Sequence, residues 1–218
     1  MTTRKRKSED MFENLFEAKI DEIKNALNEK NIFMKEEFIE EGNEKKINIY
    51  LTDKDNNSIG KIMGGIGEFY IVIDDEKMET DAFSIIWVDV DKNYQGFSLG
   101  TFLIIYCIYL CKTKYNYIEY IVLDNDTDQI DQNKNIYIKL GFIYQETNQV
   151  LNEDGQMITV IGGPEMQLKI SDFFNDLLVD KLNKILITLK NWNKMGGKKS
   201  KKSKRKRKKS KKTKKRKS

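Results

Sequence analysis

The stretch Tyr94-Gln95-Gly96-Phe97-Ser98-Leu99-Gly100-Thr101 decides how the fold of this chain is interpreted. It follows the strand-like run 82–90 and opens the apolar run 99–112, so it is predicted to join the end of a strand to the start of a helix. Its small residues leave the backbone approachable, and the first N–H groups of a helix lack partners within that helix. The pattern therefore predicts an anion site, most often for phosphate, although an ordinary strand-to-helix turn remains the alternative.

A second informative stretch, Ile136-Tyr137-Ile138-Lys139-Leu140-Gly141-Phe142, lies some 35 residues further on. The pattern predicts a helix over 128–140, because Gly141 is a suitable residue to end one. A strand over 142–146 follows, and a buried strand over 118–123 separates the two stretches.

In this order and spacing the two stretches resemble the cofactor motifs of the GCN5-related N-acetyltransferases (GNAT). Residues 95–100 resemble the family loop Arg/Gln-x-x-Gly-x-Gly/Ala, and residues 137–142 resemble Tyr-x-Lys-x-Gly-Phe. Ser98 stands where the family usually has glycine, and Lys92 where many relatives have proline. The asparagine that often begins the later helix in the family has two candidates here, Asn133 and Asn135. The resemblance implies acetyl-CoA as acyl donor, no metal, and these coenzyme-binding residues: Val88 and Val90 through their backbone groups, Gln95, Gly96, Phe97, Ser98, Leu99, Gly100, Thr101 and Asn133.

The resemblance also implies a mechanism in which an amine attacks the thioester directly, within a ternary complex. Tyr137 would be the general acid that reprotonates the thiolate leaving group, a task that suits a phenol because it holds its proton at neutral pH. The general base is open between Asp89, Glu68 and a chain of water molecules.

The predicted fold is α/β, with a GNAT-like mixed, mostly antiparallel sheet flanked by helices. A basic disordered terminus (1–8) precedes a helix and connection (9–45). The acetyltransferase-like domain (46–170) begins with a meander of strands over 46–53, 58–66, 69–74 and 82–90. An amphipathic helix (171–195) and a disordered Lys/Arg-rich tail (196–218) complete the chain.

Charge is segregated along the sequence. Residues 198–218 hold 16 of the 39 Lys and Arg residues and no acid, so residues 1–197 carry 23 bases against 34 acids, a net charge of −11. The acidic domain favours a cationic acceptor, either a basic protein segment or a polyamine. The tail predicts non-specific binding to nucleic acid, a nuclear address or a solubilising segment. A second interpretation is therefore an inactive GNAT-like domain in a nucleic-acid-associated or packaging protein.

Composition excludes several other classes. The chain has no histidine, which removes imidazole bases, Ser-His-Asp triads and nearly all zinc sites. Cys107 and Cys111 are four residues apart on one predicted helix, which favours buried, reduced thiols. The most apolar run, 102–111, is too short to cross a bilayer, and the charged N-terminus is no secretory signal. We therefore expect an intracellular protein, cytoplasmic or nuclear, without membrane association.

Overall fold

The computed structural model describes residues 3–42, 44–74, 76–125, 135–145, 147–151, 157–161, 165–173 and 176–192. Its helices are α1 (Thr3–Asn28), α2 (Leu99–Lys114), α3 (Ile136–Lys139), α4 (Ile170–Phe173) and α5 (Asp176–Lys190). Its strands are β1 (Phe33–Glu41), β2 (Glu44–Thr52), β3 (Ser58–Ile73), β4 (Glu76–Val90), β5 (Tyr120–Asp124), β6 (Ile143–Tyr144), β7 (Thr147–Leu151), β8 (Met157–Ile161) and β9 (Glu165–Lys169).

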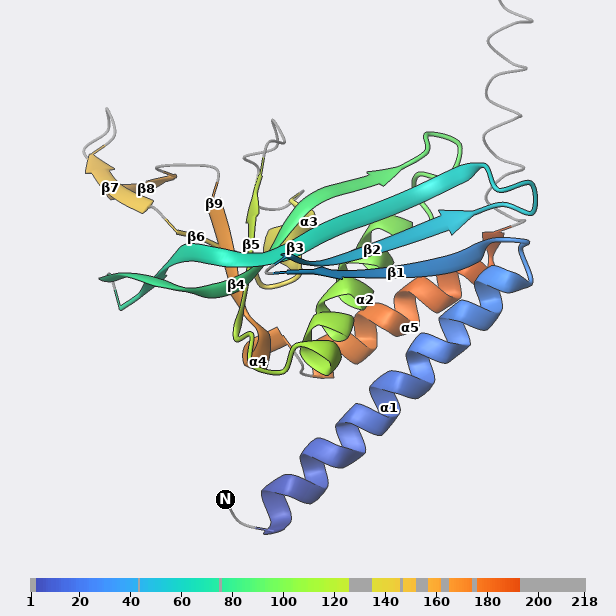
Figure 1. Cartoon of the computed structure of the whole chain (residues 1–218), viewed down its shortest axis with the longest axis horizontal. Coiled ribbons are helices and arrows are strands. Elements are labelled where there is room, and N and C mark those ends of the chain that lie inside the picture. The colour runs from blue at the N-terminus through green and yellow to red at the C-terminus, as the bar shows by residue number, and fades with distance from the viewer. Residues whose placement is uncertain are drawn as a thin grey trace, which may run out of the picture.

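Seven of the strands form one sheet in the order β1-β2-β3-β4-β5-β9-β6, and β7 pairs with β8 as a separate hairpin (Figure 1). Neighbouring strands in the large sheet run antiparallel, except β4 and β5, which run parallel. A parallel pair needs a crossover connection, and here α2 supplies it. This arrangement confirms the predicted α/β class with a mixed, mostly antiparallel sheet flanked by helices.

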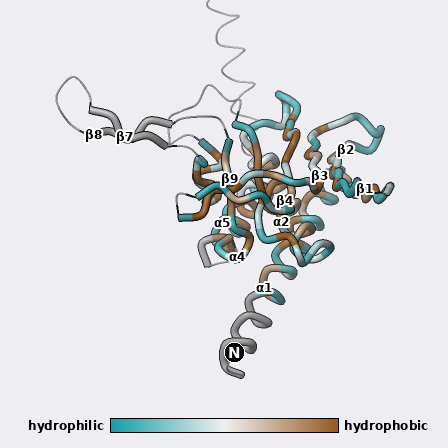
Figure 2. Tube along the Cα trace, turned by 60° about the vertical axis from the view of Figure 1, so that its left-hand side comes forward, coloured by the Kyte–Doolittle hydropathy of each residue, from teal (hydrophilic) through white to brown (hydrophobic). Residues whose placement is uncertain are grey.

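The main core lies between the sheet and helices α1, α2 and α5. Ten of the sixteen residues of α2 are buried, because this helix packs between the sheet and the two other long helices. In Figure 2 the hydrophobic stretches concentrate in the centre of the molecule, whereas the hydrophilic ones lie toward its outside. A smaller cluster of Ile71, Ala82, Tyr120 and Val122 covers part of the opposite face of the sheet.

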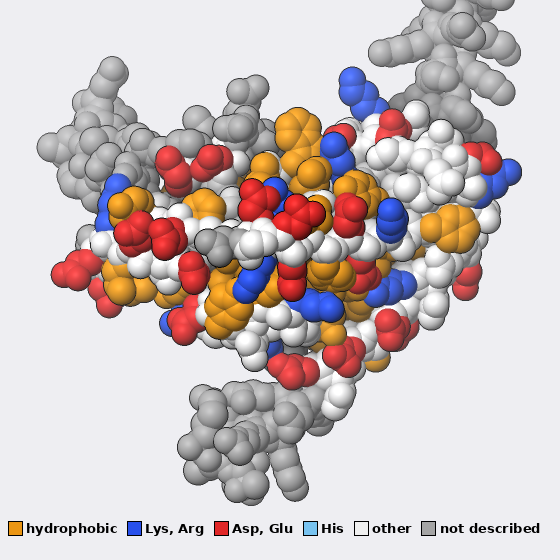
Figure 3. Space-filling model, viewed as in Figure 1, with side chains coloured by type: hydrophobic (Ala, Val, Ile, Leu, Met, Phe, Trp, Pro, Cys, Tyr) orange, Lys and Arg blue, Asp and Glu red, His pale blue; other side chains and the backbone are white. Residues whose placement is uncertain are grey.

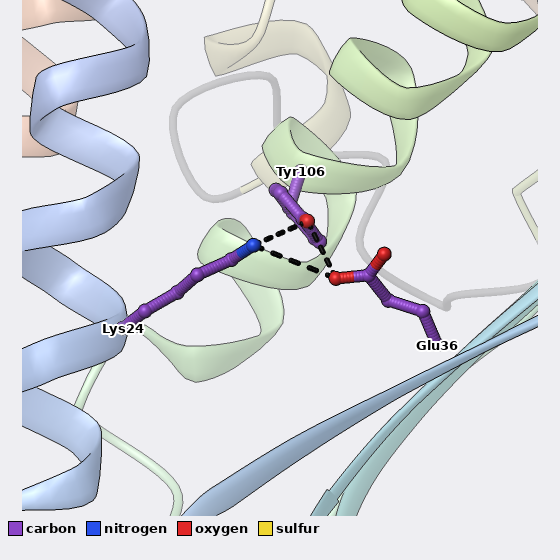
Figure 4. A network of polar contacts seen from close by, with 3 residues as sticks. All are labelled: Lys24, Glu36 and Tyr106. Atoms are coloured by element: carbon purple, nitrogen blue, oxygen red, sulfur yellow. Dashed lines mark hydrogen bonds and ion pairs between the residues drawn. The ribbon is translucent and has the colours of Figure 1, made fainter.

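A partly buried polar network, centred on the buried Tyr106, joins α1 to this core (Figure 4). The Tyr106 hydroxyl on α2 donates to Glu36 Oε1 on β1 at 2.6 Å and accepts from Lys24 Nζ on α1 at 2.6 Å. Burial and the neighbouring Glu36 carboxylate raise the pKa of Tyr106 well above its usual range. Because each polar group has a partner, the network holds three elements together without an unsatisfied buried atom.

The two cysteines are free and buried on α2, which confirms the prediction of reduced thiols. Burial raises the pKa of Cys111 to about 12 and that of Cys107 well above its usual range. None of the helices in the described part of the chain is both long and apolar enough to cross a membrane.

Several elements differ from the sequence prediction. Strand β1 occupies residues that were expected to form a connection. Its glutamates are accommodated there because they accept hydrogen bonds: Glu36 from the Tyr106 hydroxyl on the helix-covered face, and Glu37 from the Tyr50 hydroxyl on the other face. Helix α1 begins at Thr3, within the terminus expected to be disordered; the Arg and Lys residues there are good helix formers.

Other boundaries shift as well. Strand β3 is continuous where two strands were expected, and the β7–β8 hairpin was not predicted. The helix expected over 171–195 corresponds to α4 and α5. Most of the helix predicted over 128–140 lies outside the described residues, as do Asn133 and the tail 196–218.

Candidate active site

Strands β4 and β5 separate near the middle of the sheet. They pair only over Phe83–Ile85 and Ile121–Leu123, and β5 ends at Asp124, whereas β4 continues to Val90. The backbone edge of β4 beyond Ile85 therefore has no strand beside it on the β5 side, within the described residues. This split leaves hydrogen-bonding groups of a central strand available to another molecule.

The direction of those groups follows from the hydrogen bonds at the end of β4. The Asp91 N–H donates to the Ile59 carbonyl of β3 at 2.8 Å. Because successive residues of a strand direct their backbone groups to opposite edges, those of Val88 and Val90 point into the split. The Val90 carbonyl is engaged there already, since it accepts from Gln95 Nε2 at 3.1 Å.

A β-bulge interrupts β4 at the start of the split. Met63 pairs with Trp87 and Gly64 pairs with Ile85, so Ile86 has no partner on β3. Both Ile86 and Trp87 are exposed, at 66% and 55% of their surface, because the bulge breaks the inside–outside alternation. Bulges bend a strand and re-aim its groups, and they occur often beside active sites. Nothing local in the sequence marks this one.

The loop after β4 has the conformation that an anion site needs. Gly96 (φ 86°) and Ser98 (φ 62°, ψ 20°) are both left-handed, and Ser98 is the N-cap residue of α2 without a capping hydrogen bond from its side chain. Such residues turn successive N–H groups toward one side. The first turn of α2 adds its own N–H groups and the positive end of the helix dipole.

The predicted loop residues divide into two sets. Phe97 and Leu99 are buried and anchor the loop in the main core, whereas Gln95 and Gly96 are exposed and Ser98, Gly100 and Thr101 are half-buried. A Cβ on Gly100 would lie 3.6 Å from Val90 Cγ2, an ordinary contact. Gly100 is thus not required by packing, which leaves close approach of a ligand as a reason for glycine.

Tyr137 lies on the other side of the split, on α3, which leads into β6 beyond β5 and β9. Its ring is half-buried against the main core and packs edge-on against Phe142 at 5.9 Å. Asn135 fixes α3, because its buried side chain accepts from the Tyr137 N–H at 2.8 Å. Asn135 also donates to the Tyr144 hydroxyl, which accepts from Asn125 as well. Asn135 therefore positions α3 and the backbone of Tyr137.

A cavity of about 260 Å³ lies where β4 and β5 begin to separate. Two carboxylates line it, Asp124 and Glu165, which face each other as cross-strand partners on β5 and β9. Like charges directly opposite each other are unfavourable unless a cation lies between them. The remaining lining residues are Phe69, Tyr70, Lys77, Ser84, Val122, Leu123 and Gln145.

Of the two residues considered as general base, Asp89 lies on β4 beside the split, whereas Glu68 lies on β3, farther from it. Asp89 is exposed, and its cross-strand partner on β3 is Lys61. Glu68 is exposed as well, and its cross-strand partner on β4 is Asp81. Asp124, at the end of β5, lies closer to the split than Glu68 does in the strand register. A carboxylate directly after a buried strand is the sequence pattern that could have identified Asp124. Among the described residues no cluster of side chains suits a metal ion.

Comparison with known proteins gives structural matches only. No protein-family model matches the chain, and no curated protein matches its sequence. Among solved structures, the chain resembles arylalkylamine N-acetyltransferase 2 from Aedes aegypti (16% identity, TM-score 0.38, covering 56% of this chain and 73% of that one). It also resembles a mutant AtaT toxin bound to the C-terminus of the antitoxin AtaR and acetyl-CoA (10% identity, TM-score 0.39, covering 59% of this chain and 69% of that one). A third similar structure is the KacTA–DNA complex (13% identity, TM-score 0.40, covering 64% of this chain and 73% of that one).

The matched structures include GNAT acetyltransferases. Because the identities are so low and the TM-scores lie below 0.5, we base the functional proposal on the split, the loop and Tyr137 of this chain.

Proposed function

We propose that this protein is an N-acetyltransferase that transfers the acetyl group of acetyl-CoA to an amine. The observation that carries the proposal is the split itself: an open backbone edge of β4 leads directly into a loop with two left-handed residues at the N-terminus of a buried helix. The edge suits the amide groups of pantetheine, and the loop suits a pyrophosphate.

The chemistry follows from this placement. An acceptor amine attacks the thioester carbonyl carbon, the C–N bond forms, and the C–S bond breaks. The N–H of Val88 points into the split and would stabilise the negative charge that develops on the carbonyl oxygen. The departing thiolate takes a proton, which we assign to the Tyr137 hydroxyl, and the amine gives up its own proton to a base or to water.

The acceptor would occupy the cavity beside the split. The lining holds two carboxylates, Asp124 and Glu165, against one cation, Lys77, a formal balance of −1 that suits an ammonium group, and the rings of Phe69 and Tyr70 offer apolar contact. This lining suits a primary amine on an aliphatic arm, such as a lysine of a basic protein segment or a polyamine. Binding both substrates together agrees with direct attack in a ternary complex.

Two substitutions at one position test the coenzyme site. Gly100→Glu places a carboxylate in the first turn of α2, where it interacts favourably with the positive end of the helix dipole but repels a pyrophosphate. Gly100→Ala adds only a Cβ with room in the structure. We expect calorimetry to show acetyl-CoA binding abolished by Gly100→Glu, with thermal stability kept, and a smaller loss for Gly100→Ala. Unchanged affinity in a folded Gly100→Glu variant would refute the assignment of the loop.

A further inference from the structure

The outer part of the β3–β4 hairpin stands apart from the rest of the large sheet. This outer hairpin comprises residues 67–73 of β3 and 76–82 of β4, which pair with each other. Strand β2 pairs with β3 only as far as Ile66, and β5 pairs with β4 only from Phe83 onward. Within the described residues the outer hairpin therefore has no strand on either side. A two-stranded hairpin is at best marginally stable in water by itself, so other contacts must hold it in place.

Two glutamine side chains hold the outer hairpin against the sheet. Gln167 on β9 accepts a hydrogen bond from the Val72 N–H at 2.8 Å and donates one to the Val72 carbonyl at 2.5 Å. Gln145, just after β6, donates to the Tyr70 carbonyl at 2.9 Å. In Figure 1 the outer hairpin crosses β5 and β9, and Ile71 adds apolar contact because it packs into the smaller hydrophobic cluster.

Gln167 is an amide in a buried position. Only 5% of its surface is exposed, and its neighbours on β9, Met166 and Leu168, are buried in the main core. Glutamine is mostly an exposed residue, and a buried polar group needs a hydrogen-bonding partner. The amide fits Val72 because it offers one acceptor and one donor, as the backbone of a neighbouring strand does. Gln167 therefore substitutes for the missing strand at this point of the edge of β3.

The docked outer hairpin forms one wall of the cavity beside the split. Phe69, Tyr70 and Lys77 come from the outer hairpin, whereas the other lining residues come from β4, β5, β9 and the turn after β6. The cavity therefore keeps its shape only while the outer hairpin is docked. Gln167 holds the outer hairpin without lining the cavity, so it acts on a molecule in the cavity only through that wall.

The same segment carries charge that suits a cationic acceptor. Residues 67–82 include six acidic residues and one basic residue, Lys77. Acidic side chains are spread over the face of the molecule shown in Figure 3, which includes the hairpin. A polycation is attracted to such a surface, and its binding would in return favour the docked state.

We propose that Gln167 is a positioning residue for the acceptor: it docks the acidic outer hairpin, which completes the cavity and favours a polycationic amine. This inference rests on the proposed function. It goes further because it assigns acceptor affinity to a buried residue outside the cavity and separates that affinity from coenzyme binding.

The first measurement needs no turnover. Amide hydrogen exchange of the full-length chain is compared with that of Gln167→Met, which keeps the length of the side chain but cannot pair with Val72. We expect the Val72 amide to exchange at least about tenfold faster in this variant, because it loses its buried acceptor. The control Tyr50→Phe removes a hydrogen bond to Glu37 at β1 and β2, and it should leave the exchange of Val72 unchanged.

A second variant, Gln167→Glu, keeps the size of the side chain. The ionised carboxylate cannot donate to the Val72 carbonyl and is unfavourable in a buried site, whereas the protonated acid can accept and donate as the amide does. We expect the protection of Val72 to be low at neutral pH and to recover as the pH falls toward the pKa of this carboxyl group. Protection equal to that of the natural chain in both variants at neutral pH would overturn the role of Gln167.

The second measurement concerns the acceptor. Calorimetric titration with an oligolysine peptide, at saturating coenzyme A, should give a Kd at least about tenfold higher for Gln167→Met than for the natural chain, because a smaller fraction of molecules has the cavity complete. The Kd for acetyl-CoA should stay unchanged, since the loop and the free edge of β4 lie outside the outer hairpin.

The outcomes separate the two proposals. Equal Kd values for the peptide in both chains, or no peptide binding by the natural chain, would overturn the inference, while binding of acetyl-CoA leaves the proposed coenzyme site standing. Absence of acetyl-CoA binding in every chain would instead overturn the proposed function, and the inference with it.

Discussion

Gly64 is the residue whose replacement probes the β4 bulge most directly. A Cβ at this position would lie 2.4 Å from Phe83 Cε1 and 2.5 Å from the Ser84 carbonyl oxygen. Both distances are far below an ordinary contact, and the carbonyl belongs to the backbone of the central strand, which cannot move alone. Phe83 is fully buried, so its ring has no free space to enter.

The magnitude follows from this overlap. Overpacking a core typically costs about 1–3 kcal/mol, and we expect about 3 kcal/mol for Gly64→Ala because both a buried ring and a backbone carbonyl are involved. For a chain of this length, 1 kcal/mol lowers Tm by about 2–4 °C, so the expected fall is about 6–12 °C. The displacement of β4 should also weaken acetyl-CoA binding.

The matched control is Gly65→Ala, one residue along the same strand. Its Cβ would lie 3.3 Å from the Lys45 carbonyl oxygen and 3.4 Å from Lys46 Cγ, which small shifts relieve. We expect a change within about 1 kcal/mol, because alanine also costs less backbone entropy than glycine in a strand. Thermal unfolding followed by circular dichroism measures both variants. Equal stability of the two would refute the close packing inferred at the bulge.

Two further predictions concern tyrosines. Tyr137→Phe should lower kcat by about 10²–10⁴-fold with little change in the Kd for acetyl-CoA, whereas the control Tyr50→Phe should change neither kcat nor Kd. A loss of acetyl-CoA binding in Tyr137→Phe as large as its loss of kcat would make Tyr137 a structural residue. Tyr106→Phe should cost about 1–3 kcal/mol in urea unfolding, because Lys24 and Glu36 lose a buried partner. Since the folded pKa of Tyr106 is raised, its contribution is present below about pH 10 and declines as pH rises further, so the natural chain should lose stability there faster than Tyr106→Phe. Parallel profiles of stability against pH for the natural chain and Tyr106→Phe would contradict this role of Tyr106.

Local sequence patterns were enough to predict the elements that frame the site. The loop was visible because Gly96, Ser98 and Gly100 interrupt a change from strand to helix, and Gly141 marks the end of α3. The apolar run that forms α2 was equally clear, since a helix buried on all sides needs hydrophobic residues throughout.

What could not be predicted depends on contacts between distant residues. Strand β1 is rich in glutamate, and only its partners on α2 and β2 make that composition suitable for a strand. The bulge at Ile86 depends on register with Gly64, and nothing around Ile86 itself signals it. The stacking of Trp192 on Phe97 follows from tertiary packing alone.

We propose that acetyl-CoA binds in the split between β4 and β5, against the loop at the start of α2. Amide hydrogen exchange of the full-length protein, with and without acetyl-CoA, tests both binding and location in one measurement. We expect exchange to slow at Val88 and Val90, in the loop 94–101 and in α3, and to stay unchanged in β1 and β2. Unchanged exchange throughout the split at saturating acetyl-CoA, or protection confined to other elements, would contradict the claim.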